Sequence, residues 1–81
     1  MRGWAARQYQ DRLASLSERE RETLLALAHG LGNAELAQEL FITGATVKAH
    51  ISNVFTKIRA RSRVEAAMFA YGSGFIRPHW T

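Results

Sequence analysis

Apolar residues recur at the three- and four-residue spacing of amphipathic helices in four segments of the chain. No segment alternates apolar and polar residues over several positions, as a half-buried strand would. The pattern therefore predicts an all-α fold with four short core helices and no sheet. The apolar positions are, in chain order, Leu24, Leu27, Ala28 and Leu31; Leu36, Ala37 and Leu40; Val47, Ile51, Val54, Phe55 and Ile58; and the run from Val64 to Tyr71.

Residues that cap helix ends stand before each of these segments. Ser17 and Ser62 are each followed three residues later by Glu, the capping-box pattern in which two side chains and two backbone amides bond reciprocally. Asn33 and Thr43 are expected to cap the second and third helices. Glycines after the first and fourth segments are expected to end those helices, and Pro78 prevents any continuation of the fourth.

The two ends of the chain are less regular than its middle. Tyr9 and Leu13 share the i, i+4 spacing of a helix, so residues 1–15 are interpreted as a linker or a flanking helix. Residues 16–72 form the predicted helical domain, and residues 73–81 form a tail. The apolar residues of this tail either fold back onto the helices or stay apart from them.

The positive charge is confined to one part of the chain. Eleven Lys and Arg residues stand against seven Asp and Glu residues, a formal charge of +4. Residues 43–63 hold Lys48, Lys57, Arg59, Arg61 and Arg63 and no acid, so this segment carries all of the excess. Such a basic cluster indicates a polyanionic partner, as in nucleic-acid binders.

Several classes of function lack the residues that they need. The chain has no cysteine and its three histidines have no ligand spacing, so we expect no metal and no cofactor. No Ser–His–Asp set and no phosphate-binding glycine loop is recognisable, so we expect no enzyme. No apolar run approaches the roughly 18 residues of a membrane span, and no signal peptide is visible. These features fit a cytoplasmic protein with no membrane partner.

The helix expected over residues 43–58 has an unusual outer face. At 100° per residue its large apolar residues fall within one arc, which must face the core. The opposite face is small and uncharged. It consists of Ala45, Ala49, Ser52, Asn53 and Thr56, with Lys48 and Arg59 along one edge and His50 and Lys57 along the other.

A face of this kind suits the major groove of DNA. The groove is about 12 Å wide, small side chains let a helix approach the base edges, and the flanking cations can reach phosphates on both strands. With the preceding helix at residues 33–42, the segment predicts a helix-turn-helix whose recognition helix is 43–58. The plainer alternative is a basic helix face that is merely solvated.

Three sequence stretches extend this interpretation. They are LSERERETLLALAHGLGNAELAQEL, FITGATVKAHISNVFTKI and RSRVEAA, within about Leu16 to Tyr71. In their order and spacing they resemble the LuxR/NarL-type helix-turn-helix domain of bacterial transcription regulators. The resemblance implies a four-helix domain whose third helix enters the major groove and whose fourth commonly forms the dimer contact.

The resemblance also implies roles for particular residues, and the charge pattern adds others. Base contacts fall on Ala45, Lys48, Ala49 and Ser52. Phosphate contacts are expected from Thr46, Asn53 and Lys57 by resemblance, and from Arg59 and Arg61 by charge, while His50 is either a phosphate donor or a packed side chain. The dimer contact is expected at Val64, Ala67, Met68 and Tyr71, although this apolar surface could instead receive Trp4 and Tyr9.

The sequence departs from the family pattern at three points. Ala34 stands where the family often has a basic residue, so one phosphate contact is missing. Arg59 stands where many members have Gly, so it must adopt a strained left-handed conformation or end the helix differently. Ala49 and Ser52 have little hydrogen-bonding reach, so Lys48 would carry much of the base reading, with DNA shape contributing.

The expected partners follow from the same resemblance. Double-stranded DNA and a second copy of the domain come first. Most members carry a signal-receiving domain before this one, and regulators act on RNA polymerase, so both are expected partners of an excised effector domain; a stand-alone regulator is the alternative. Glu20 and Arg63 are either surface charges or, as the family pattern favours, partners in a salt bridge that joins the first and fourth helices. The rival function is a protein-interaction module that pairs with a full-length regulator and blocks it without reading DNA.

Overall fold

The structure is a computed structural model that describes the backbone of residues 2–76, with side chains from residue 7 onward. This part of the chain contains five helices and no strand, which confirms the all-α prediction. The helices are α1 (Arg2–Ala14), α2 (Glu18–Ala28), α3 (Asn33–Leu40), α4 (Gly44–Ile58) and α5 (Arg63–Gly72).

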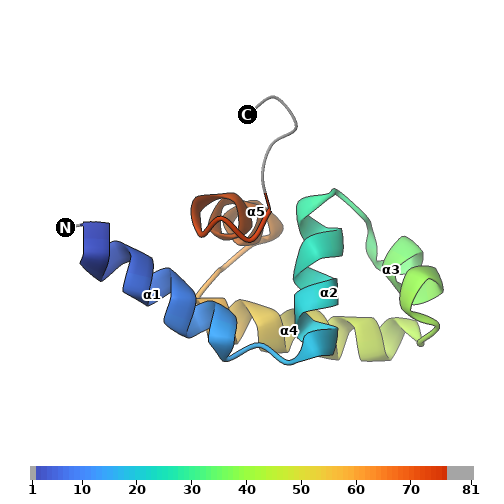
Figure 1. Ribbon diagram of the computed structural model, residues 1–81. Coiled ribbons are helices and arrows are strands. Elements are labelled where there is room, and N and C mark those ends of the chain that lie inside the picture. The colour runs from blue at the N-terminus through green and yellow to red at the C-terminus, as the bar shows by residue number, and fades with distance from the viewer. Residues whose placement is uncertain (1, 77–81) are drawn as a thin grey trace.

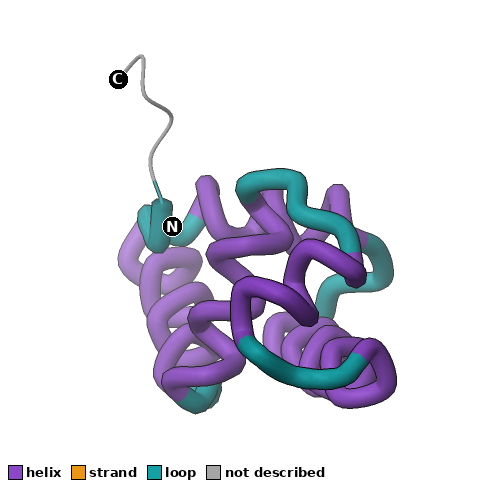
Figure 2. The backbone as a smooth tube through the Cα atoms, turned by 90° about the vertical axis from the view of Figure 1, so that its right-hand side faces the viewer, coloured by secondary structure: helices purple, strands orange, loops and turns teal. Residues whose placement is uncertain are grey.

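The helices are arranged around α2. This helix crosses α4 and also packs against α5 (Figure 1). At one end of the molecule α3 lies beside the start of α4, and at the other end α1 lies beside the C-terminal half of α4. Figure 2, which looks from the α3 end, shows that short loops join the helices. The outer face of α4 is thus left without a neighbouring helix.

Two groups of buried apolar side chains hold the helices together. The larger group joins α1, α2, α4 and α5 and includes the fully buried Leu24 and Val54. The smaller group joins α2, α3 and α4 and includes the fully buried Leu36 and Val47. Full burial of such side chains contributes about 1.5–3 kcal/mol each relative to exposure. The helix-turn-helix is therefore fixed to α2 mainly by apolar packing.

The starts of the helices agree with the predicted caps at three positions and differ at one. Ser17 and Thr43 each accept a hydrogen bond from the amide three residues later, and Ser62 does the same before α5. The reciprocal capping box forms at Ser17 and Glu20 but not at Ser62, because the Glu65 carboxylate accepts the Arg61 amide at 2.8 Å instead. Asn33 does not cap α3. That helix begins one residue earlier than a capping Asn33 would allow, its cap is Gly32, and the Glu35 carboxylate accepts the Gly32 amide at 2.9 Å.

Two helices end on residues other than glycine in the left-handed conformation. Phe41 (φ 56°) follows α3 and Arg59 (φ 60°) follows α4. Left-handed geometry brings Cβ close to the neighbouring carbonyl oxygen, which costs about 1–2 kcal/mol. Arg59 thus adopts the strained conformation that was one of the two expected outcomes at this position.

The segments that flank the predicted domain pack against it. Tyr9 of α1 meets Phe69 of α5 edge to face, with ring centroids 5.5 Å apart, and Leu13 is buried in the larger core group. Residues 1–15 therefore contain a flanking helix. Phe75 and Ile76 pack against the same core group, and the Ile76 amide donates to the Ala70 carbonyl at 3.2 Å. The start of the tail thus folds back. The side chain of Trp4 and the rest of the tail, with Trp80, lie outside the described residues.

Candidate nucleic-acid interface

The outer face of α4 is exposed along its whole length. The residues expected to face the core are buried or half-buried, and Val47, Val54 and Ile58 are the buried ones. The residues expected to face outward are all exposed: Ala45, Ala49, Ser52, Asn53 and Thr56. The helical wheel therefore divided this helix correctly.

The four positions predicted to read bases form one continuous stripe. Ala45, Lys48, Ala49 and Ser52 are spaced i, i+3, i+4 and i+7, so they lie above one another on a single helix face, and all four are exposed. Their base contacts stay predictions. The stripe is nevertheless physically suited to close approach, because only Lys48 extends beyond a short side chain.

The start of α4 is held by a pair of hydroxyl groups. The Thr46 amide donates to Thr43 Oγ1 at 3.2 Å, and the two hydroxyl oxygens lie 2.9 Å apart. Thr46 is exposed, as a phosphate contact would require. The positive end of the helix dipole lies at the same place and favours a phosphate.

The cations predicted to bind phosphate differ in their surroundings. Arg59 is exposed, whereas Arg61 is exposed but lies 3.5 Å from a Glu65 carboxylate oxygen. Asn53 is exposed and His50 is half-buried, so the two alternatives for His50 stay open. Exposed ion pairs of this kind contribute little and exchange readily, so Arg61 keeps the freedom to meet a phosphate.

Lys57 forms a salt bridge with a buried glutamate of the same domain. Its Nζ lies 2.8 Å from Glu20 Oε1, and the side chain of Glu20 is only 8 % exposed against 39 % for Lys57. The expected salt bridge between Glu20 and Arg63 is therefore wrong. Glu20, at the start of α2, reaches Lys57 because α2 crosses α4 at that end (Figure 1). Arg63, at the start of α5, lies instead beside the loop that follows α2. It donates to the Leu31 carbonyl at 3.1 Å and to Asn33 Oδ1.

The Glu20 carboxylate links three parts of the site. It accepts hydrogen bonds from Lys57 Nζ and from the Ser17 amide, both at 2.8 Å. The hydrogen bond from Lys57, followed by that from Ser17, lowers the pKa of Glu20 against the opposing effect of burial. The ionised carboxylate thus caps α2 and holds the last turn of α4 at the same time.

The residues expected to form a dimer contact share one side of α5. Val64 is 69 % exposed, Met68 66 % and Tyr71 40 %, with Ala67 partly buried between them. Large apolar side chains that are this exposed and this close together favour a partner. Tyr9 packs on Phe69, so the alternative in which α1 covers α5 holds for part of that helix only.

Sequence reasoning missed two features of this region. Phe41, in the turn between α3 and α4, is 93 % exposed, and the periodicity gave no reason to expect a large apolar residue in water there. The Arg63 bridge to Leu31 and Asn33 was also missed. Arg63 joins residues some thirty positions away along the chain, and no local pattern reports such a contact.

The arrangement of α3 and α4 defines a helix-turn-helix domain of the DNA-binding class. Comparisons with known proteins agree. The family model described as bacterial regulatory proteins, luxR family, matches residues 14–70. The chain therefore belongs to the LuxR family, and its domain serves DNA binding in transcription regulation.

Individual relatives support this assignment. The transcriptional regulatory proteins LnrK and LiaR of Bacillus subtilis (strain 168) are 45 % and 46 % identical over 62 residues, which is 76 % of this chain but 28 % and 29 % of theirs. The response regulator protein VraR of Staphylococcus aureus is 40 % identical, with 76 % of this chain and 30 % of VraR covered. Full-length FixJ from B. japonicum superposes with a TM-score of 0.77 at 35 % identity, covering 93 % of this chain and 38 % of FixJ. The chain thus spans about a third of the length of these relatives.

Neither a membrane-spanning helix nor a cluster of metal ligands is found among the residues that the structure describes. None of their helices is both long and apolar enough to cross a membrane. No three metal-ligating side chains among them lie close enough together to hold an ion.

Proposed function

We propose that this chain reads a specific sequence of double-stranded DNA as the effector domain of a bacterial transcription regulator. In this proposal α4 enters the major groove with Ala45, Lys48, Ala49 and Ser52 toward the base edges. The observation that carries the proposal is the exposed, acid-free face of α4, whose only long side chain at these four positions is Lys48.

The electrostatic part of the affinity comes from the edges of that face. Arg59 and Arg61 extend the positive charge past the end of α4. Thr46 and Asn53 offer uncharged hydrogen-bonding groups along the edge of the face that also carries His50 and Lys57. Each phosphate neutralised by a cation releases counterions, so binding should weaken as salt rises. Lys57 contributes less to this term than the sequence suggests, because Glu20 already neutralises it. His50 contributes only if its half-buried ring reaches the backbone.

Dimerisation through α5 completes the proposed binding mode. The exposed side of that helix (Val64, Ala67, Met68 and Tyr71) would meet its copy in a second domain. Two-fold symmetry would then place two α4 helices in successive major grooves about one helical turn apart.

The remaining partners belong to a longer protein. The relatives are about three times as long as this chain, and VraR is named a response regulator. A signal-receiving domain before α1 and an action on RNA polymerase in the cytoplasm are therefore part of the proposal. The rival is an interaction module that pairs through α5 with a full-length regulator and never binds DNA. The acid-free face of α4 argues against this rival, since such a module has no need of it.

The test is selection of random duplex DNA with the full chain at moderate salt, read by sequencing. An enriched inverted repeat supports sequence reading and the dimer together. A single enriched half-site supports reading alone. The absence of enrichment, with uniform loss of binding as salt rises, would overturn the proposal in favour of the rival.

A matched pair of variants separates the groove face from general effects of charge. Ala49→Glu places an acid on the exposed face of α4, and Ala14→Glu places one at the exposed end of α1. We expect Ala49→Glu to abolish enrichment and Ala14→Glu to preserve it, with both proteins folded by circular dichroism. Equal losses in the two variants would show that only total charge matters.

A further inference from the structure

The turn of the helix-turn-helix carries the most exposed of the large apolar side chains in the described part of the chain. Phe41 is 93 % exposed, against 69 % for Val64 and 66 % for Met68 on the proposed dimer helix. An aromatic ring held in water gains nothing from burial within its own domain. The packing of this domain therefore does not explain why residue 41 is a phenylalanine, whereas a contact with another molecule would.

The backbone at Phe41 makes that position still less favourable. Its φ of 56° lies in the left-handed region, where glycine is the natural residue. The chain thus tolerates backbone strain and an exposed ring at the same residue. The left-handed backbone itself serves the turn, because it ends α3 and lets the Ile42 amide donate to the Ala37 carbonyl at 3.0 Å. The exposed ring is what the turn does not require, and it is the reason to look for a binding role.

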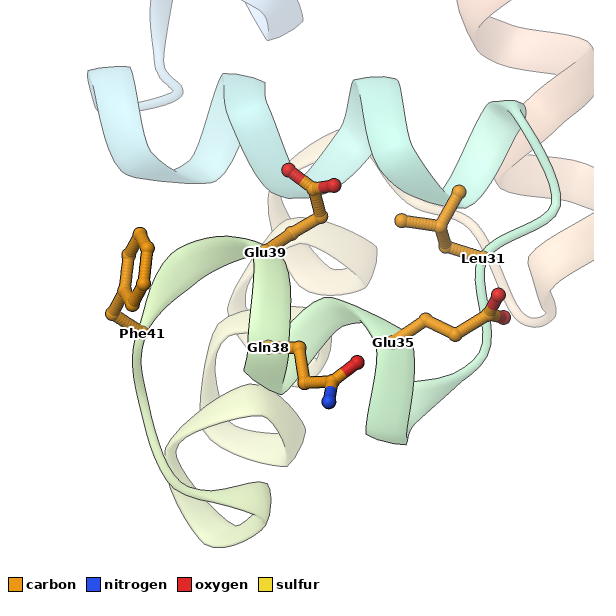
Figure 3. A pocket seen from close by; sticks show the side chains of 5 residues that line it. All are labelled: Leu31, Glu35, Gln38, Glu39 and Phe41. Carbon is orange, nitrogen blue, oxygen red and sulfur yellow. The ribbon is translucent and has the colours of Figure 1, made fainter.

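Phe41 stands at the edge of a hollow formed by α3 and the loop residues just before and after it (Figure 3). Leu31, Glu35, Gln38, Glu39 and Phe41 line it, and Figure 3 shows the Glu39 side chain directed toward α2. A second hollow adjoins it on the α2 side, shares two of these lining residues, and adds the apolar side chains of Leu25 and Leu40. No residue of α4 lines either hollow.

The titratable residues that line these hollows are three glutamates, Glu22, Glu35 and Glu39, and one histidine, His29. The helix α3 carries Glu35 and Glu39 and no cation, and neither makes an ion pair within the described residues. Glu22 lines the second hollow and pairs with Arg19 at 3.4 Å, with both side chains nearly half exposed. An apolar floor with an acidic rim repels a phosphate backbone and attracts cations.

We propose that this surface, the α2–α3 hollow (Leu25, Leu31, Glu35, Glu39, Leu40 and Phe41), docks a cationic, amphipathic segment of another protein. One apolar side chain of that segment would enter the hollow beside the Phe41 ring, and its cations would meet Glu35 and Glu39. Aromatic anchors with a complementary charged rim are the usual composition of interface centres. The proposal deepens the proposed function by giving the DNA-bound domain a second, separate contact.

Charge and position select this occupant over two others. A second copy of this chain has two basic segments to offer. The first lies on and after α4 and is committed to DNA in the proposed function, and the second is α1, whose apolar side chains Tyr9 and Leu13 already pack in its own core. A domain joined before α1 would attach at the opposite end of the molecule from α3 (Figure 1). A different basic protein remains, and the α2–α3 hollow stays open to it because α4 forms none of its walls.

The test uses the full chain labelled with ¹⁵N and a synthetic amphipathic helix with leucines on one face and lysines on the other. A twin peptide with glutamates in place of the lysines serves as the probe control. We expect the lysine peptide to shift the amides of Leu31, Glu35, Glu39 and Phe41 at low salt and the glutamate peptide to leave them unchanged. Shifts centred on α5, or equal binding of both peptides, would overturn the proposal.

Variants then locate the contact. We expect Phe41→Ala and the double variant Glu35→Gln with Glu39→Gln each to raise the Kd of the lysine peptide about ten-fold, and Phe41→Trp to restore it. Glu18→Gln removes an exposed acid at the start of α2, outside the α2–α3 hollow, and should change the Kd less than two-fold. An equal effect of Glu18→Gln would reduce the binding to general attraction between charges and overturn the proposal.

Two more measurements distinguish this proposal from self-association of the chain and from the proposed DNA-binding function. Concentration-dependent self-association that Phe41→Ala abolishes would assign the hollow to a second copy and overturn the choice of occupant. DNA selection with Phe41→Ala should still enrich the wild-type site. If the wild-type chain enriches no DNA while the peptide results hold, the proposed function fails and the docking surface stands.

Discussion

Lys57 Nζ donates to Glu20 Oε1 at 2.8 Å, which joins the last turn of α4 to the first turn of α2. The two residues are 37 positions apart, and the carboxylate also accepts the Ser17 amide. Removing either partner leaves the other without its counter-charge, and burial makes this loss larger on the Glu20 side. The pair therefore fixes the C-terminal end of α4 against the start of α2.

A double-mutant cycle should measure this linkage. We expect Glu20→Gln to lower the free energy of unfolding by about 1–3 kcal/mol, because a buried neutral amide is a weaker acceptor than the carboxylate for Lys57 Nζ and the Ser17 amide. Lys57→Met should cost less, since Lys57 is the more exposed partner. The coupling energy from urea unfolding of the two single variants and the double variant should exceed about 0.5 kcal/mol.

The matched control for that cycle is the exposed pair Arg61 and Glu65. Both side chains are more open to water than Glu20, and their atoms lie 3.5 Å apart. The coupling in this second cycle should fall within about 0.5 kcal/mol of zero. Strict additivity of Glu20→Gln and Lys57→Met would contradict the inferred role of the buried pair.

The same carboxylate should make stability depend on pH in the acid range. The pKa of Glu20 is lowered in the folded protein, so its contribution is fully present above the unfolded value near 4.5. That contribution is lost as pH falls through the lower folded pKa, where the native carboxylate takes up its proton. Melting temperatures between about pH 2 and pH 7 should therefore decline less steeply for Glu20→Gln than for the wild type. Parallel curves for the two proteins would show that other carboxyl groups account for the decline.

Arg59 offers a test in which stability and DNA binding change in opposite directions. Arg59→Gly removes the strain of a left-handed arginine, and we expect a gain of up to about 1 kcal/mol, or roughly 4–8 °C in Tm. Arg61→Gly, at a position without positive φ, is the control and should not stabilise. If Arg59 binds phosphate, the salt dependence of DNA affinity should fall by about 0.9 in log–log slope for Arg59→Gly. An unchanged slope would remove Arg59 from the phosphate set.

Lys48 should decide between sequence reading and general attraction. On a site obtained by selection, we expect Lys48→Ala to cost about 1–3 kcal/mol and to relax base preference at one or two positions. Arg61→Ala should weaken binding about equally on selected and random DNA, as a phosphate contact does. Competition binding on both DNAs checks this. A uniform loss for Lys48→Ala would place Lys48 among the phosphate contacts.

Much of this fold was predictable because its signals are local. The spacing of apolar residues gave the four core helices, and Ser17 and Thr43 cap helices through contacts only three residues long. The exposed face of α4 followed from the same periodicity. Local patterns could not give the partner of Glu20, which depends on where α2 crosses α4, or the contacts of Arg63. They also could not show that Phe41 remains exposed to water, because its exposure depends on how the other helices pack and on the fact that none of the described ones covers it.

The exposed side of α5 should govern dimerisation and little else. Met68→Asp places a charge at the centre of a face whose neighbours Val64 and Tyr71 are also exposed, so a dimer would have to bury that charge without a partner. We expect affinity for a selected inverted repeat to fall at least ten-fold and affinity for a single half-site to change less than two-fold. Leu25→Asp, an exposed apolar residue on α2, controls for the added charge and should leave the ratio of the two affinities unchanged. Gel-shift titration on both DNAs measures this ratio, and equal losses on both would show that α5 supports the fold of the monomer and not the pairing of two domains.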